Sequence, residues 1–475
     1  MMRRLFLFFL CLTAVTRLIA ADGIQDDERQ KKFPGGKCFL YRVQLSDKNG
    51  TPYRLDRAEE FLSSKSIERR RRQRLAIDST DLPVNPHYIQ RVISDKVTLI
   101  GQSKWNNTLL VKVRDAKDVK ALRSLPFVKE VIKVWTSPDS VKPTVRTLFH
   151  KELNKWETAP EDEYGFAGAN IDLVKGRSLH QMGCRGKGMT IAVFDGGFMN
   201  VDRIPAMKNV KIVGTRDFLS FPSTDIYKEA DHGTKVLSAM ALNMPGTYIG
   251  TAPDAEFWLM RTEDVQTESL AEEDYWTFAA EFADSLGVDI ISSSLGFQDF
   301  DDKTTDHQYV ELDGEHALIS RTASMLSAKG IVLVNSAGNE GVGTWKKINF
   351  PADAKDILAV GAVNKSKKNA TFSSVGPTQD GRVKPDIMAL GSPASVMSGR
   401  GMINSDMGTS FAAPIISGLV ACLWQSAPLK TATQVMEAVR RSSDNYATPN
   451  NVFGYGIPDF EKAVELLKMK DKNER

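Results

Sequence analysis

Short apolar segments without polar interruption recur along the chain from about residue 190 onward. A strand that is buried on both faces has this composition, because helices cover both sides of a parallel sheet. We therefore expect buried strands at Ile191–Phe194, Phe257–Met260, Ile290–Ser294, Ile331–Val334 and Ile357–Val360.

Longer stretches with helical character separate these apolar segments. They are His232–Leu242, Leu270–Leu286, Glu315–Lys329 and Phe411–Gln425. Strands that alternate with helices predict an α/β fold, in which a doubly wound, mostly parallel sheet carries helices on both faces. We assign this fold to residues 165–475.

The chain before this region has a different pattern. Residues 22–136 combine three strand-like segments with one helix-like segment, Lys117–Leu125, which Pro126 ends. The predicted strands are Val97–Ile100, Leu109–Val113 and Val128–Val134. This β-β-α-β order predicts a small α+β domain. Residues 137–164 are polar and contain several prolines, as expected of a linker.

A basic run, Glu68–Arg74, lies within the predicted small domain. The ordinary interpretation is a solvated helix face, since blocks of like charge are usually exposed. The alternative is a protease-sensitive basic site that helps to dismantle the domain. Both interpretations place the arginines at the surface.

Residues 1–21 have the pattern of a cleaved export signal. Two arginines precede an apolar stretch, Leu5–Ala14, that is too short to span a bilayer comfortably, and small residues follow it. We expect an exported protein, secreted or periplasmic, without a stable membrane anchor. Cys11 lacks the small preceding residue of a lipidation site, which disfavours a lipoprotein.

Charge and cysteine content argue against several classes of protein. The formal net charge is +3 over 475 residues, which does not indicate a nucleic-acid partner. Cys38, Cys184 and Cys422 remain once the signal is removed. An odd number without close spacing argues against a disulfide framework and a zinc site. Cys422 lies in an apolar helix, where a buried, unreactive thiol is expected.

Three polar residues stand at the ends of predicted elements. Asp195 ends a strand, whereas His232 and Ser410 each begin a helix. Singly, they fit a turn, a structural histidine and a helix cap. Together they supply the groups of a Ser-His-Asp hydrolase, in which the acid holds the imidazole that takes the serine proton. Asp231 is a rival acid, but neighbouring helix residues point in different directions, which favours a capping role.

A fourth segment, Asn335–Gly341, follows a predicted strand. Loops of this composition are usually turns. The hydrolase chemistry nevertheless needs donors for a tetrahedral oxyanion, and the amide of Asn339 could be one. The backbone N–H of Ser410 could be another, because the first N–H groups of a helix have no intrahelical partner.

These segments together resemble the subtilisin-like serine proteases, or subtilases. Gly408–Pro414 nearly matches the nucleophile motif, Asp231–Thr234 matches the histidine motif and Ala337–Asn339 matches the oxyanion loop. The order Asp, His, Ser along the chain is also that of subtilisin. Further matches are Ser294–Gly296, Phe350–Ala352, Val360–Val363, Phe372–Pro377 and Gly381–Asp386.

The resemblance implies a role for each matching residue. Asp195 would orient His232, which would take the proton of Ser410 as this serine attacks a peptide carbonyl. Asn339 would help to hold the oxyanion. The residues implied to line the substrate cleft, where the substrate pairs as an added strand, are Ser294, Leu295, Gly296 and Gly338.

The same resemblance implies an exported serine endopeptidase that acts through an acyl-enzyme and is made as a self-processing precursor. The small domain would be the propeptide, an intramolecular chaperone and inhibitor. Protein or peptide substrates are the other expected partners, and a monomer is expected. The chemistry requires no cofactor. Structural calcium would be typical of the family, but no segment identifies a site for it or for another metal.

The chain departs from the family pattern at two positions. Gly196 stands where Ser or Thr is usual, and Lys235 replaces a frequent second histidine. These departures leave an alternative open, in which the chain is a binding protein with the same scaffold but without catalytic activity. An esterase would share the triad but belongs with a Gly-x-Ser-x-Gly elbow, whose second glycine is absent from Gly408–Ala412.

Overall fold

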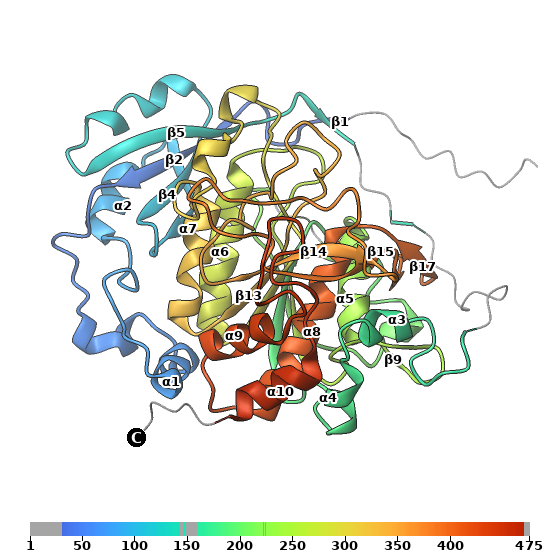
Figure 1. Cartoon of the computed structure of the whole chain (residues 1–475). Coiled ribbons are helices and arrows are strands. Elements are labelled where there is room, and N and C mark those ends of the chain that lie inside the picture. The colour runs from blue at the N-terminus through green and yellow to red at the C-terminus, as the bar shows by residue number, and fades with distance from the viewer. Residues whose placement is uncertain (1–30, 143–145, 148–158, 222, 224, 470–475) are drawn as a thin grey trace, which may run out of the picture.

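The computed structural model describes residues 31–142, 146–147, 159–221, 223 and 225–469 (Figure 1). The predicted signal segment with Cys11 lies outside these residues, as does part of the predicted linker. The described chain forms a large α/β part and a smaller sheet domain that lies against it (Figure 1).

A seven-stranded sheet forms the centre of the large part, with the order β15-β14-β13-β12-β7-β11-β8. Every neighbouring pair is parallel, which confirms the predicted sheet. Every strand predicted for this region is present. The bounds are β7 (Thr190–Asp195), β8 (Lys211–Asp217), β11 (Glu256–Arg261), β12 (Ile290–Ser293), β13 (Val332–Ser336), β14 (Leu358–Asn364) and β15 (Ile387–Ser392).

The two edge strands, β8 and β15, escaped the sequence analysis for different reasons. β8 alternates exposed and partly buried residues around a glycine, so it has no continuous apolar run. β15 is buried, but it begins Ile-Met-Ala-Leu, and methionine, alanine and leucine favour helices over strands.

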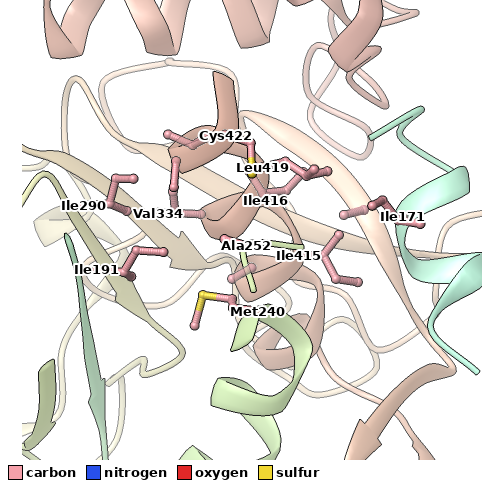
Figure 2. Packing of buried hydrophobic residues seen from close by; sticks show 14 of the residues in the cluster. Ile171, Ile191, Met240, Ala252, Ile290, Val334, Ile415, Ile416, Leu419 and Cys422 are labelled. Atoms are coloured by element: carbon pink, nitrogen blue, oxygen red, sulfur yellow. The ribbon is translucent and has the colours of Figure 1, made fainter. Parts of the chain in front are cut away.

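Alternate side chains of β7 enter two separate cores. Ile191 and Val193 pack with α5 and α8 on one face of the sheet, and Figure 2 shows Ile191 beside residues of that core. Ala192 and Phe194 pack with α6 and α7 on the other face. Helices on both faces are therefore confirmed. Their bounds are α5 (His232–Ala241), α6 (Ala271–Leu286), α7 (Leu318–Met325) and α8 (Thr409–Ser426).

The start of α7 differs from the prediction, and the composition of α8 resembles that of a membrane span. α7 begins at Leu318 rather than Glu315, because the carboxylate of Asp313 accepts the N–H groups of Glu315 and His316 in a preceding turn. Among the described helices, α8 has the length and apolar composition of a membrane span, but 89% of it is buried inside the protein.

Smaller elements complete the large part. Further helices on the face of α5 and α8 are α3 (Gly168–Asp172), α4 (Arg177–Gln181), α9 (Ala432–Ser442) and α10 (Phe460–Lys468). The short antiparallel pairs are β9 (Asn243–Met244) with β10 (Tyr248–Ile249), and β16 (Ala394–Met397) with β17 (Ile403–Asp406). Cys38, Cys184 and Cys422 are free and buried, and burial raises the pKa of each thiol.

The smaller domain is a four-stranded antiparallel sheet with the order β3-β4-β2-β5. One of its two inner strands, β2, was not predicted. The helix predicted at Lys117–Leu125 is wrong, because only two short 3-10 turns form there, and they bury Val119 and Leu122. The bounds are β2 (Phe39–Leu45), α1 (Ser64–Gln73), α2 (Pro86–Val92), β3 (Val97–Ser103), β4 (Thr108–Val113) and β5 (Val128–Thr136). β1 (Lys31–Lys32) pairs with β6 (Ser140–Val141) outside this sheet.

Two polar contacts join the small sheet to helix α6. The guanidinium of Arg42 on β2 forms a buried ion pair with Asp274, 2.7 Å away. The carboxylate of Glu281 accepts hydrogen bonds from the hydroxyl of Ser103 and from the backbone N–H groups of Lys104 and Trp105. The sheet is thus docked onto the outer side of α6.

The basic run forms most of helix α1, and the prediction that its arginines lie at the surface is wrong for two of them. Arg69 and Arg70 are 3% and 1% exposed, and both form ion pairs with the buried Asp284 of α6. Arg70 also pairs with Asp81 at 2.8 Å. The sequence could not show this, because the acid that draws the arginines inward lies far along the chain.

Candidate active site

The carboxylate of Asp195 lies beside the imidazole of His232. Asp195 ends β7 and is fully buried, and its Oδ2 and Oδ1 lie 2.9 and 3.0 Å from Nδ1 of His232. A carboxylate only accepts hydrogen bonds, so Nδ1 carries the hydrogen and Nε2 is free to accept a proton. The structure thus joins these two predicted residues in the geometry of an acid–base pair.

His232 titrates under the influence of several neighbours. Burial alone would lower the pKa of its imidazole, but the negative charge of Asp195 and the hydrogen bond to it raise that pKa to about 9. The charge of Glu263 acts in the same direction, whereas Lys235 opposes it. The protonated imidazole is therefore strongly stabilised at this position.

Ser410 lies in the first turn of α8, next to the helix that carries His232. The ring of the adjacent Phe411 has its centroid 5.7 Å from that of His232. The Ser410 hydroxyl donates to the carbonyl oxygen of Ser294 over 3.3 Å, and the hydroxyl of Ser294 donates to the carbonyl of Ser410 over 2.8 Å. Among the described residues no hydrogen bond joins Ser410 to His232. Hydrogen bonds of this kind often tighten only when a substrate binds.

The side chain of Asn339 is fixed at the start of α8. Its amide oxygen accepts hydrogen bonds from the backbone N–H and the hydroxyl of Thr409, both over 3.0 Å. This leaves the NH₂ group of Asn339 as a donor beside the free helix N–H of Ser410. Both are the kinds of donor that an oxyanion requires.

The four residues predicted to line a cleft lie around this point. Gly338 has a φ of +110°, and a side chain there would approach the hydroxyl of Ser374 to 2.8 Å, so only glycine fits. Ser294 and Leu295 are buried in the full chain, and Gly296 is exposed. Leu295 and Ser294 can therefore offer only backbone groups to a ligand while the side chains remain buried.

Glu263 is a neighbour that the sequence analysis missed. A side chain at Gly196 would come within 2.7 Å of the Glu263 carboxylate, so this acid fills the space that a residue after Asp195 would otherwise occupy. Burial and the charge of Asp195 raise the pKa of Glu263 to about 7. The one signal in the sequence was the glycine at position 196, which shows a missing side chain but not what replaces it.

The other departure, Lys235, lies outside this arrangement. Its ammonium group pairs with Asp406 at 2.9 Å and with Asp231 at 3.8 Å on the surface of α5. Asp231 accepts the backbone N–H of Gly399 and makes no side-chain capping bond to the helix. The capping role predicted for Asp231 is therefore wrong, since its carboxylate is committed to a neighbouring loop.

Within the described residues, no group of three or more His, Cys, Asp or Glu side chains is placed to hold a metal ion.

Comparison with known proteins gives matches over both parts of the chain. Residues 186–456 match the model of the subtilase family, peptidase S8. Residues 40–147 match the model described as the peptidase S8 propeptide domain of Bacteroidota.

Individual relatives extend the same comparison. Subtilisin NAT of Bacillus subtilis subsp. natto is 29% identical over 298 residues, which cover 62% of this chain and 70% of that protein. Subtilisin of Bacillus pumilus is 28% identical over 298 residues, which cover 62% of this chain and 98% of the relative. Membrane-bound transcription factor site-1 protease of Rattus norvegicus is 30% identical over 300 residues, covering 61% of this chain and 26% of that protein.

The family match spans more than half of the chain and includes Asp195, His232, Asn339 and Ser410. The chain therefore belongs to the subtilase family of serine endopeptidases and carries a peptidase S8 propeptide domain ahead of its peptidase domain.

Proposed function

We propose that this subtilase is an exported endopeptidase that cuts its own precursor and then cleaves protein substrates through Asp195, His232 and Ser410. The observation that carries this proposal is the Asp195–His232 pair, with 2.9 Å between Oδ2 and Nδ1, next to the helix start that presents Ser410. Asp195, His232 and Ser410 come from three separate elements, β7, α5 and α8.

The reaction follows from the state of each group. Nε2 of His232 accepts the hydroxyl proton as Oγ of Ser410 attacks the substrate carbonyl, and Asp195 stabilises the resulting imidazolium. The tetrahedral adduct then collapses, the C–N bond breaks, and the imidazolium donates its proton to the leaving amine. Water hydrolyses the acyl-enzyme by the same steps in the opposite order, which restores the serine.

The oxyanion is assigned to two donors, the NH₂ of Asn339 and the backbone N–H of Ser410. Thr409 fixes the amide of Asn339 before any substrate arrives, so the donor needs no reorganisation during the reaction. The partial positive charge at the start of α8 favours the same negative oxygen. No cofactor enters these steps, and any structural calcium remains unplaced.

The proposed precursor has a signal at residues 1–21, a propeptide at 22–136, a linker at 137–164 and a peptidase domain at 165–475. The docked small domain supports this division, because its contacts with α6 hold it close to the peptidase part. We infer that it assists folding and blocks the cleft until the linker is cut. Export, secretion or periplasmic residence, and a monomeric product without a membrane anchor complete the proposal.

Replacement of His232 tests the endopeptidase function. The wild-type chain should shorten by its own action and digest denatured casein, and His232→Ala should do neither. His316→Ala is the matched control. His316 is an exposed histidine that pairs with Glu311, and it makes no contact with Asp195 or His232 among the described residues. Casein digestion by the His232→Ala chain would refute the assignment.

Loss of the Asn339 amide should slow the reaction without altering the fold. Asn339→Ala is expected to lower kcat about 10²–10³-fold with little change in KM, the effect measured when the oxyanion asparagine of subtilisin is removed. Steady-state hydrolysis of a short peptide ester or amide measures it. Asn209→Ala, at an exposed position just before β8, is the control and should keep full activity. An unchanged kcat in Asn339→Ala would remove this residue from the oxyanion site.

Glu263 should shift the pH dependence of the enzyme. Activity requires neutral His232, so kcat/KM rises as the pH passes the pKa of the imidazole. Glu263 has a pKa of about 7 and is ionised when His232, with a pKa of about 9, loses its proton. Its negative charge therefore raises the pKa of His232. Without this charge, in Glu263→Gln, kcat/KM should rise at a lower pH than in the wild type.

The pH profile of kcat/KM measures this shift. Glu256→Gln removes an exposed acid from the opposite end of β11 and should leave the pH of this rise unchanged. If kcat/KM rises at the same pH in the wild type and in Glu263→Gln, Glu263 does not influence the pKa of His232.

A further inference from the structure

Arg146, in the described part of the linker, binds the loop that follows Asp195. The Nε of Arg146 donates to the amide oxygen of Asn200 over 2.7 Å, and its guanidinium forms an ion pair with Asp202. The Arg146 side chain is only 11% exposed. The amide of Asn200 also donates to the carbonyl oxygen of the next linker residue, Thr147, over 2.8 Å. The linker is thus held by both its side chain and its backbone.

Asn200 is a rigid receptor for these contacts. It is fully buried with a φ of +61°, in the left-handed region that asparagine tolerates better than most residues. Its NH₂ group also donates to the carbonyl oxygen of Gly399 over 2.8 Å, so protein contacts fix the orientation of the amide. The oxygen of that amide is therefore presented to Arg146 in a fixed direction.

This receptor borders the proposed triad. The backbone N–H of Met199, next to Asn200, donates to the carbonyl of Ala230, and the Met199 carbonyl accepts the hydroxyl of Thr234. These bonds tie the receptor to the chain on either side of His232. Asp202 lies a little farther along the same loop, where Arg203 is a second neighbouring cation, 3.9 Å away and about half exposed.

The linker is held a second time on its N-terminal side. The backbone N–H of Lys142 donates to the side chain of Gln266 over 2.9 Å. Gln266 follows Val265, which lies against Gly196, the residue after Asp195. The two holding points therefore lie near the two ends of the Asp195–Asn200 segment, Lys142 toward Gly196 and Arg146 at Asn200.

We propose that Asn200 and Asp202 form a substrate subsite for an arginine side chain on the C-terminal side of the bond that is cut. Arg146 fills this subsite in the precursor, and substrates fill it after maturation. This proposal rests on the proposed function, because it treats the linker as the first substrate of the triad.

Arginine fits the subsite better than lysine or a neutral residue. Its guanidinium uses two nitrogens at once, Nε toward Asn200 and Nη2 toward Asp202. A lysine has a single terminal nitrogen, so it cannot place two separate nitrogens against these two acceptors as the planar guanidinium does. A pocket adjoins Thr147 and leaves room for a neighbouring substrate residue. It is lined by Thr147, Met199, Asp231, Lys235, Ser398, Arg400 and Asn404.

A matched set of internally quenched peptides tests the subsite. Arg, Lys or Gln is placed in turn at each position after the cut bond, and kcat/KM is compared within each enzyme variant. The wild type should prefer Arg to Gln about tenfold at one position, as expected for a charge-assisted contact that is partly exposed. N-terminal sequencing of the mature enzyme fixes that position in advance, because it must equal the place of Arg146 after the natural cut.

Three variants complete the test. Asp202→Asn should reduce the Arg-to-Gln ratio to near one, and Asp202→Arg should turn the preference toward Glu at the same position. Asp254→Asn removes an acid that pairs with Arg185 near the other end of β11, and it should keep the wild-type ratio. Because the Arg and Gln peptides are compared within the same variant, the ratio of their kcat/KM values does not depend on the overall activity of that variant.

A fluorophosphonate that labels active serine hydrolases separates the possible failures. A wild-type enzyme that labels but shows no preference for Arg at the predicted position overturns the subsite and leaves the proposed function intact. A preference that persists unchanged in Asp202→Asn also overturns it. An enzyme that neither labels nor cleaves any peptide overturns the proposed function instead.

Discussion

Replacement of Ser410 by alanine is expected to abolish self-processing, so that the full-length precursor accumulates. In the proposed mechanism the hydroxyl oxygen of Ser410 forms the covalent bond to the substrate, so this variant lacks the nucleophile. Removal of the triad serine of subtilisin lowers kcat about 10⁶-fold. A loss of this size leaves no mature enzyme on the timescale of an expression experiment. Gel electrophoresis and mass spectrometry of the purified chain measure the outcome.

The matched control for this variant lies in the same helix. Ser426 is the last residue of α8, and its hydroxyl donates only to the carbonyl of Leu423. Ser426→Ala should mature at the wild-type rate. A Ser410→Ala chain that matures without any added protease would show that another group performs the cut.

Loss of Asp284 should loosen helix α1 of the propeptide domain. Asp284→Ala leaves Arg69 and Arg70 buried without their shared counter-charge, although Arg70 keeps Asp81. Removal of one partner from a buried ion pair costs about 3–5 kcal/mol. Hydrogen exchange of the α1 amides in the uncut Ser410→Ala background should accelerate about 10²–10⁴-fold if that cost falls on local opening.

An exposed acid provides the control for this experiment. Asp299 pairs with Lys303 at the surface, where both side chains are about two-thirds exposed. Exposed pairs contribute at most about 1 kcal/mol, so Asp299→Ala should leave the exchange of α1 unchanged. Exchange in Asp284→Ala equal to that of the parent would show that the buried cluster does not hold α1 in place.

The parallel sheet and the acid–base pair were predictable from sequence because each depends on local pattern. Ile191–Phe194 is uninterruptedly apolar, as a strand between two helical layers must be. Asp195 follows it at the carboxyl end, where functional groups of open α/β sheets collect. The motifs around His232 and Ser410 then identified the partners, and 2.9 Å between Asp195 and His232 agrees with that expectation.

Features that depend on distant partners were not predictable in the same way. Arg69 and Arg70 read as solvated charges until Asp284 appears beside them, more than 200 positions along the chain. Glu263 follows β11, and only the three-dimensional fold shows that it occupies the space over Gly196. Likewise β2 was missed, although it is one of the two inner strands of the propeptide sheet, because its Arg42 and Gln44 interrupt the apolar pattern.

The most direct test of the account is covalent labelling of the mature enzyme with a fluorophosphonate, followed by peptide mapping. We expect one stoichiometric adduct on the hydroxyl of Ser410 in the wild type. We expect none in Asp195→Ala or His232→Ala after an added protease has removed the propeptide domain from these variants. A stoichiometric adduct on a different serine, or undiminished labelling of Ser410 without His232, would contradict the account.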